Sequence, residues 1–355
     1  MKRPIFFFSI LYPLLGWDQQ GHKIVARIAS NLMQDETRKF LNDVAGLGPD
    51  VASKLAFISI QPDTDIVLQD PRYKDSGNLH FAFTDSSCSR FDLSRDCPKG
   101  ECIVTGLSRF ALMASDPKQS RDVIKDAIMF VVHFMADMHQ PLHIGFRSDE
   151  GGRFIFLTDP GTTLHNVWDV VLYEHYMDKR RPFNKHRLWN YFDLASDLVD
   201  QMKSEKVDYS GGIEEPNDTS ILCSVQSYAA DIASETTSKY TCDFAYANEK
   251  GDWIMSGDKL DAFYMDDRSR VVIEQFKVAG FRLAALLDKI AATYLTKKLK
   301  MQNDFKDAPV LMGLKPASKN ISSPGINKIS FADLVKCGKK VENTKWSDIA
   351  RKADR

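Results

Sequence analysis

Residues 121–139, RDVIKDAIMFVVHFMADMH, are the segment that most constrains how this chain can fold. The segment is apolar on most faces of a helix, which is typical of a helix buried at the centre of a domain. It nevertheless contains His133 and Asp137, which stand four residues apart and therefore share one face of that helix. Burying either side chain without a partner would cost roughly a few kcal/mol. The fold must therefore bring partners to this face.

A second pair with the same spacing, His165 and Asp169, lies in LHNVWD, and His143 stands between the two pairs. Imidazole nitrogens and carboxylate oxygens together are donors that suit Zn²⁺. For a single His-Asp pair, a hydrogen-bonded couple in a helical core is the simpler interpretation. The repeated spacing and the histidine between the pairs favour a metal site instead.

Helical periodicity extends over most of the chain and predicts a mainly α architecture. The expected helices cover residues 21–33, 121–139, 163–177, 186–204, 225–240 and 268–298, with long loops at 46–80 and 85–105. Only short stretches such as 154–157 look strand-like. A formal net charge of −1 indicates no overall attraction to a polyanion, so any affinity for phosphate must be local.

The two ends of the chain differ in composition from the rest. Residues 1–16 combine the basic pair Lys2 and Arg3 with an apolar stretch and a final glycine, which predicts a signal peptide that leaves Trp17 as the first residue. No other run is long enough for a membrane span, so we expect a protein that is secreted or lies in the lumen of the secretory pathway, without a transmembrane anchor. Residues 299–355 are rich in Lys, Asn and Ser and predict a flexible C-terminal extension.

The six cysteines fit an exported protein, because an even number in such a chain suggests disulfides. Cys97 and Cys102 flank a Pro-Lys-Gly turn and are expected to pair locally, whereas the connectivity of the others stays open, with Cys88 and Cys242 as further candidates. Asn217 and Asn320 begin acceptor sequences for N-glycosylation.

Seven motifs follow one another in a characteristic order. They are WxxxGH (17–22), LHF (79–81), SRFDLSRDC (89–97), HFMADMHQPLH (133–143), SDEGG (148–152), LHNVWD (164–169) and GFRLAALLDKI (280–290). With these motifs, residues 17–295 resemble the zinc-dependent nucleases of the S-one/P-one family, which includes fungal single-strand-specific nucleases, plant bifunctional nucleases and parasite 3′-nucleotidase/nucleases. The resemblance implies a nuclease domain over residues 17–298. It also implies a helical bundle like that of phospholipase C, with three zinc ions in a cleft.

The resemblance further implies which residues hold each ion. The implied ligands are His80, His133, Asp137 and either Asp63 or Asp65 for the first zinc; Trp17, His22 and Asp137 for the second; and His143, His165 and Asp169 for the third. The local context Pro62-Asp63 favours Asp63, whereas ungapped spacing to His80 favours Asp65, and both remain open. Trp17 would bind through its α-amine, which must first be freed by signal cleavage. A free α-amine has a pKa of about 7.7–8.0 and must lose its proton to bind the metal.

The implied activity is hydrolysis of single-stranded DNA and RNA to 5′-nucleotides, with 3′-nucleotides as further substrates. A hydroxide that bridges two zinc ions would be the nucleophile. Asp137 and either Asp63 or Asp65 would hold these two ions. We expect a monomer.

Four positions near this site concern the substrate rather than the metal. Phe81 matches the position that stacks on a base, and Phe83 stands where some members have an aspartate that reads the base. Arg72 is the basic residue nearest to the place where members often carry Lys or Arg. Arg153 stands where Asn is expected after the DEGG sequence.

Two alternatives remain open. A zinc phospholipase C uses a similar helical three-metal site, but its members have a longer gap between the N-terminal Trp and the next His and end the cluster in Glu, where this chain has Asp169. The other alternative is a secreted homologue that binds zinc or nucleotides without catalysis. Phe83 and the missing basic residue are the features that favour it.

Overall fold

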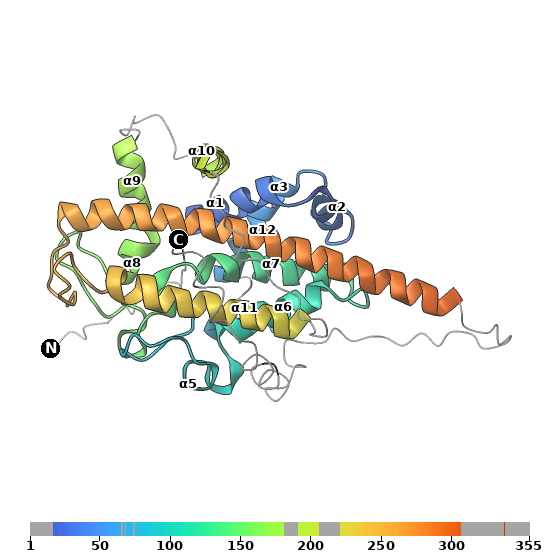
Figure 1. Cartoon of the computed structure of the whole chain (residues 1–355), viewed down its shortest axis with the longest axis horizontal. Coiled ribbons are helices and arrows are strands. Elements are labelled where there is room, and N and C mark those ends of the chain that lie inside the picture. Colours follow the sequence, from blue (N-terminus) through green and yellow to red (C-terminus); the bar gives the residue numbers. More distant parts are fainter. Residues whose placement is uncertain are drawn as a thin grey trace, which may run out of the picture.

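The computed structural model describes residues 17–64, 67, 69–73, 75–180, 191–205, 221–306 and 337. The described residues are predominantly helical, which confirms the predicted mainly α fold (Figure 1). In this part of the chain, β-structure is limited to isolated bridges. One bridge joins Phe156 to Thr163, so among the described residues the strand-like stretch at 154–157 forms a single bridge and not an extended strand.

The helices occur in the following order along the chain. The α-helices are α1 (Gln19–Leu32), α2 (Asp35–Asp43), α3 (Val51–Ile58), α5 (Leu93–Asp96), α6 (Ile103–Ala114), α7 (Arg121–Asp137), α8 (Leu164–Asn166), α9 (Leu172–Arg180), α10 (Tyr191–Glu205), α11 (Ile221–Glu235) and α12 (Ala262–Lys306). Short 3₁₀ helices are η1 (Gln61–Asp63), η2 (Ser76–His80), η3 (Pro98–Gly100), η4 (Pro141–Ile144) and η5 (Arg147–Asp149), and π-helical segments are η6 (Val167–Val171) and η7 (Thr236–Ala245).

Helix α7 lies in the middle of the bundle, as its sequence predicts (Figure 1). The side chain of Ser120 caps its first turn by accepting a hydrogen bond from the Val123 N–H. From Ala127 to Asp137 every residue is buried, and α7 packs against α1, α3, α6 and α12. The polar face that carries His133 and Asp137 is therefore enclosed by protein.

Helix α12 runs along most of the molecule in Figure 1 and packs against α1. A Cβ atom on Gly280 would lie 2.4 Å from Cγ2 of Ile28, so glycine is needed where the two helices cross. The helix extends from Ala262 to Lys306, beyond the predicted range of 268–298 at both ends. Residues 299–306, which we predicted to be part of a flexible extension, instead continue this helix.

The two segments predicted as long loops contain helices. Helix α3 lies within 46–80, and α5 together with η3 lies within 85–105. Asp50 caps α3 by accepting a hydrogen bond from the Ser53 N–H, a start signal that is visible in the sequence. Helices α2 and α6 were not predicted either. Charged residues make up most of α2, and small residues interrupt the apolar pattern of α6.

Three disulfides confirm the prediction made from the cysteine count. Cys97 pairs with Cys102, Cys88 with Cys242, and Cys223 with Cys337. The second bond ties the loop after η2 to η7, and the third joins α11 to a residue of the predicted extension.

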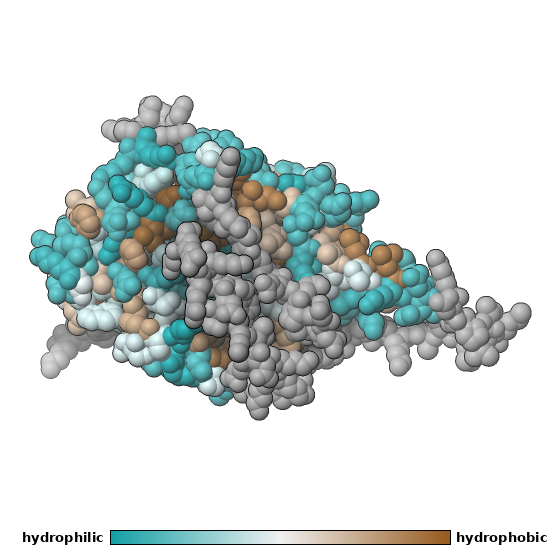
Figure 2. Space-filling model, in the orientation of Figure 1, coloured by the Kyte–Doolittle hydropathy of each residue, from teal (hydrophilic) through white to brown (hydrophobic). Residues whose placement is uncertain are grey.

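Several predictions lie outside the described residues: the signal peptide at 1–16, Asp65, and the glycosylation sites Asn217 and Asn320. Within the described part, no helix is both long enough and apolar enough to cross a membrane. The face drawn in Figure 2 is largely hydrophilic with separate apolar patches (Figure 2).

Candidate metal centre and active site

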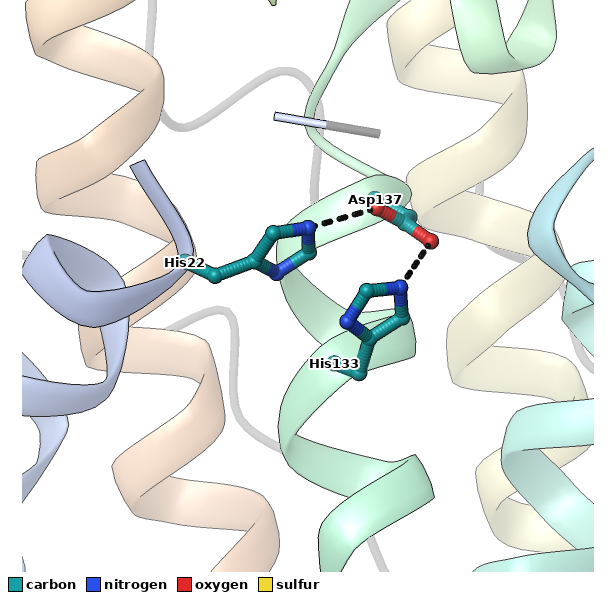
Figure 3. Close-up of side chains that lie close together, drawn as sticks. All are labelled: His22, His133 and Asp137. Carbon is teal, nitrogen blue, oxygen red and sulfur yellow. Dashed lines mark ion pairs between the residues drawn. The ribbon is translucent and has the colours of Figure 1, made fainter. Parts of the chain in front are cut away.

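Helices α1 and α7 bring His22, His133 and Asp137 together in the interior, with both imidazoles pointing at one carboxylate (Figure 3). His22 Nε2 lies 3.2 Å from Asp137 Oδ1, and His133 Nε2 lies 3.1 Å from Asp137 Oδ2. The two rings stack with their centroids 3.9 Å apart. All three side chains are at most 1 % exposed, so this first group of donors is closed off from bulk water.

Asp63 at the end of η1 and His80 at the end of η2 form a second group with His133. Asp63 Oδ1 lies 3.4 Å from both His80 Nδ1 and His133 Nε2. His80 Nδ1 also lies 3.0 Å from Asp137 Oδ2. The carboxylate of Asp137 therefore stands between the first and second groups. Of the two aspartates left open by the sequence, the structure places Asp63 here, and Asp65 is not among the described residues.

A third group consists of His143 from η4, His165 from α8 and Asp169 from η6. His165 Nε2 lies 3.2 Å from Asp169 Oδ2, and the rings of His143 and His165 are stacked 5.2 Å apart. His143 Nδ1 lies 3.8 Å from Asp137 Oδ1, which connects this group to the first. In each group the donor atoms lie within 4.8 Å of one another, the separation expected around a metal ion.

Backbone carbonyls fix three of these imidazoles. A carbonyl oxygen can only accept a hydrogen bond, so the facing Nδ1 must carry a proton, and Nε2 is the nitrogen left to bind a metal once the ring is neutral. Histidines that bind metals are commonly held in this way. The pairs are His133 with the carbonyl of Ser59 (2.7 Å), His143 with that of His80 (2.8 Å) and His165 with that of Gly151 (2.7 Å).

Buried donor atoms without hydrogen bonds show that the cluster fits a metal. A buried polar atom left unsatisfied costs about 1–3 kcal/mol, so several at one place call for a common partner. Divalent cations held by the three groups would each pair with one nitrogen of a ring and with carboxylate oxygens, and nitrogen and oxygen donors suit zinc. Within the described part of the chain, these atoms are His22 Nδ1 and Nε2, Asp63 Oδ1, His80 Nε2, Asp137 Oδ1 and His143 Nε2.

The protonation states of the cluster follow from burial and neighbouring charges. Burial alone would lower the pKa of His133, but Asp137 and Asp63 raise it well above its usual value, so this ring would release a proton when it binds a cation. Burial lowers the pKa of both His22 and His143, so both rings are neutral at pH 7. Burial alone would raise the pKa of Asp137, but the nearby histidines, His133 foremost, lower it well below its usual value. Burial raises the pKa of Asp169 well above its usual value, so this carboxyl would release a proton when it binds a cation.

Trp17 is fully buried beside the cluster. Its indole Nε1–H donates a hydrogen bond of 2.9 Å to the carbonyl of Ala136, the residue before Asp137. The next backbone N–H, that of Asp18, lies 3.4 Å from the carbonyl of Asp169. The backbone at residue 17 is therefore held close to both Asp137 and Asp169, where the α-amine of a processed chain would begin.

The aromatic residues predicted to bind substrate lie next to the third group. Phe81 is only 6 % exposed, and its ring lies 4.5 Å from that of His143. The ring of Phe83 stacks on Phe81 at 5.1 Å and is half-buried. In this conformation Phe83 offers more surface for stacking than Phe81 does.

Arg72, the basic residue predicted to meet the phosphate, is engaged elsewhere. Its guanidinium forms ion pairs with Asp70 at 2.7 Å and with Asp126 at 2.9 Å. Asp126 precedes His133 by seven residues of α7, about 10 Å along the helix axis. The structure therefore does not bring Arg72 to the cluster.

Arg153 is the basic residue that the structure does bring there. Its Nη2 lies 3.4 Å from His165 Nε2, and its guanidinium carbon lies 4.5 Å from the centre of the Phe81 ring. The only signal in the sequence was its position directly after SDEGG, where the family resemblance predicts Asn.

Comparisons with known proteins agree with this geometry. The family model described as S1/P1 Nuclease matches residues 17–292. Endonuclease 2 of Arabidopsis thaliana is 27 % identical over 288 residues, covering 78 % of this chain and 90 % of the relative. Nuclease S1 of Aspergillus oryzae is 30 % identical over 292 residues, covering 78 % and 92 %, and Nuclease P1 of Penicillium citrinum is 26 % identical over 293 residues, covering 79 % and 100 %. The chain is therefore a nuclease, a hydrolase of phosphodiester bonds, and it belongs to the S1/P1 nuclease family.

Proposed function

We propose that this nuclease is a zinc-dependent endonuclease that cleaves single-stranded DNA and RNA to 5′-nucleotides and also hydrolyses 3′-nucleotides. The observation that carries the proposal is the convergence of three buried histidine–aspartate groups around Asp137, with donor atoms that have no hydrogen-bond partner. The Asp63 alternative is adopted because its carboxylate lies within 3.4 Å of two histidines of the cluster.

Three zinc ions would share these residues, with His133 assigned to the ion that Asp63 and His80 hold. Zinc bound here would supply Lewis acidity, both to polarise a phosphate and to make water nucleophilic near neutral pH. The proposed ligands are Asp63, His80, His133 and Asp137; Asp137 again with His22 and the amine and carbonyl of Trp17; and His143, His165 and Asp169.

The residues of the chain set the geometry of this centre. Each oxygen of Asp137 faces a different group, so this one side chain fixes the spacing between two sites. The carbonyls that hold His133 and His143 prevent these rings from turning away. Since the ligands are already in place and buried, little reorganisation is needed when a phosphate arrives.

The Phe81–Phe83 pair provides a reason for preferring single strands. Stacking on an aromatic ring contributes about 1–3 kcal/mol per base and requires a base whose face is free. Bases in a duplex are stacked on their neighbours, so only an unpaired strand could use the ring of Phe83 without first being opened. We propose that Phe83 provides the exposed part of this surface and Phe81 supports it from below.

The proposal includes a monomer that is secreted or lies in the lumen of the secretory pathway. Three disulfides are typical of an oxidising compartment. Residues 1–16 would direct the protein there as a signal peptide, and their removal would free the amine of Trp17 for binding. Processing would thus complete the second zinc site.

The test is an assay of the mature protein on single-stranded DNA, single-stranded RNA, 3′-AMP and phosphatidylcholine vesicles. We expect hydrolysis of the first three substrates, loss of activity with a chelator and recovery on adding Zn²⁺. Hydrolysis of the phospholipid alone would support a phospholipase C. A protein that retains zinc but hydrolyses no phosphoester would overturn the proposal and support a binding protein without catalysis.

A further inference from the structure

Arg153 directly follows a turn of backbone to which His165 is hydrogen-bonded. The turn is formed by Gly151 and Gly152, whose φ angles are +66° and +79°. The carbonyl of Gly151 accepts a hydrogen bond from His165 Nδ1, and that of Gly152 accepts one from the backbone N–H of His165. A Cβ atom on Gly151 would lie 2.2 Å from the carbonyl oxygen of Leu142, so this turn tolerates no larger residue there. The position of Arg153 relative to the third group is therefore defined by the backbone.

The guanidinium of Arg153 is supported on one side by an aromatic ring. Its central carbon lies 4.5 Å from the centre of Phe81, within the range of a cation–π contact. Its Nη2 lies 3.4 Å from His165 Nε2, the ring nitrogen that faces Asp169. The positive charge is thus held at the edge of the proposed metal centre.

The charge of Arg153 lacks a close anionic partner. Among the residues that the structure describes, no carboxylate forms an ion pair with it. The nearby carboxylates act on it only at longer range; they are Asp169, Glu150, Asp63 and Asp137. Arg95 and Arg282, by contrast, are each paired at short range, with Asp96 and Glu235.

We propose that Arg153 binds the phosphate of the substrate at the His143–His165–Asp169 end of the cluster. This inference rests on the proposed nuclease function. A guanidinium presents a planar fork of N–H donors that matches two phosphate oxygens. If three Zn²⁺ ions face the carboxylates of Asp63, Asp137 and Asp169, the centre is already positive, and a further cation beside it is favourable only when an anion joins them.

The same geometry specifies which substrates depend most on Arg153. A terminal 3′-phosphate is close to a dianion at neutral pH and has three free oxygens, whereas an internal phosphodiester carries one charge and two free oxygens. The fork of Arg153 therefore contributes more to binding 3′-nucleotides than to binding internal bonds of a strand.

The experiment compares Arg153→Gln and Arg153→Lys with the unmodified mature protein, all loaded with zinc. Calorimetric titration with inorganic phosphate gives Kd, and steady-state assays give KM and kcat for 3′-AMP and for a single-stranded oligonucleotide. Arg153→Gln should weaken phosphate binding and raise KM for 3′-AMP by about 10- to 100-fold, and raise KM for the oligonucleotide less. Arg153→Lys should fall between, because it keeps the charge and loses the fork. Arg38→Gln, on the surface of α2, is the matched control with the same change of charge.

Zinc content and the folding of each variant are measured alongside. Full zinc content together with unchanged phosphate Kd in Arg153→Gln would overturn the proposal. Equal loss of zinc from both Arg153 variants would also overturn it, because Arg153 would then serve His165 rather than the substrate. If the unmodified protein hydrolyses neither substrate but phosphate binding still depends on Arg153, the proposed function is refuted and the phosphate site at Arg153 is supported.

Discussion

Asp137→Asn is the substitution that tests the proposed metal centre most directly. Asp137 Oδ1 lies 3.2 Å from His22 Nε2, and Asp137 Oδ2 lies 3.0 Å from His80 Nδ1. Asparagine has almost the same size but only one oxygen, and its amide nitrogen cannot bind a cation. Whichever way the amide turns, one of the two groups loses a ligand atom, and both lose the negative charge.

The magnitude follows from this double role. Removing only a hydrogen-bond partner of a metal ligand typically costs about 10- to 100-fold in metal affinity. Loss of a ligand atom should therefore cost at least about 100-fold, or about 2.7 kcal/mol, for one of the two ions, and loss of the negative charge should weaken the binding of the other. The group of His143, His165 and Asp169 keeps its own ligands. We expect Asp137→Asn to lose two of the three proposed zinc ions and all measurable nuclease activity.

The assay is elemental analysis of zinc after dialysis against a buffer with nanomolar free Zn²⁺, with Asp169→Asn as the matched comparison. Asp169 belongs to one group only, so this second variant should lose a single ion. Near-ultraviolet circular dichroism reports whether both variants remain folded. Equal loss of one ion from both variants, or nuclease activity retained by Asp137→Asn, would refute the bridging role.

Three further predictions concern the fold and the chain terminus. Burial lowers the pKa of His139 from 6.5 to about 3, so the unfolded chain binds the proton more tightly than the folded one. The free energy of unfolding should therefore be highest above pH 6.5 and fall by about 1.4 kcal/mol per pH unit as the pH drops toward 3. Urea unfolding of chelated protein at pH 7 and pH 5 should show this dependence weakened in His139→Gln, and identical dependences would contradict it. Replacing Cys88 and Cys242 by Ser opens a loop of 154 residues and should lower the free energy of unfolding by about 5 kcal/mol, against about 2 kcal/mol for the Cys97–Cys102 disulfide, whose cysteines are five residues apart. Denaturation without reductant gives both values, and a larger loss from the local disulfide would count against the loop argument. One alanine added before Trp17 should remove one zinc ion and most activity, and full zinc content in this variant would exclude the amine as a ligand.

Much of the fold could be predicted because its central element is distinctive. Helix α7 is apolar on nearly all sides, so burial and helicity are both visible in its sequence. Helix α12 was predicted too short at its C-terminus, because the Lys-rich segment before Lys306 has weak amphipathicity although it is continuous with the packed part of the helix. Its structure depends on propagation from a stable helix more than on local pattern.

The metal centre could be predicted only in part from spacing. His133 and Asp137 lie four residues apart on one helix, so helix geometry alone brings them together. His165 and Asp169 have the same spacing and meet at 3.2 Å even though the helix changes from α to π between them. His80 meets Asp137 across 57 residues of sequence, and no local rule specifies such a contact. Only the family resemblance indicated it.

The role of a basic residue near the site depended on its partners rather than on its place in the sequence. Arg72 was favoured because it is the closest basic residue to the expected position, yet Asp70 and Asp126 already neutralise it. To bind a phosphate it would first have to break two ion pairs and move along α7. Arg153 has no such partner among the described residues and is already at the cluster, on a turn that only glycines permit. We therefore expect the free energy of binding a phosphate to be more favourable at Arg153, because no existing ion pair has to be given up.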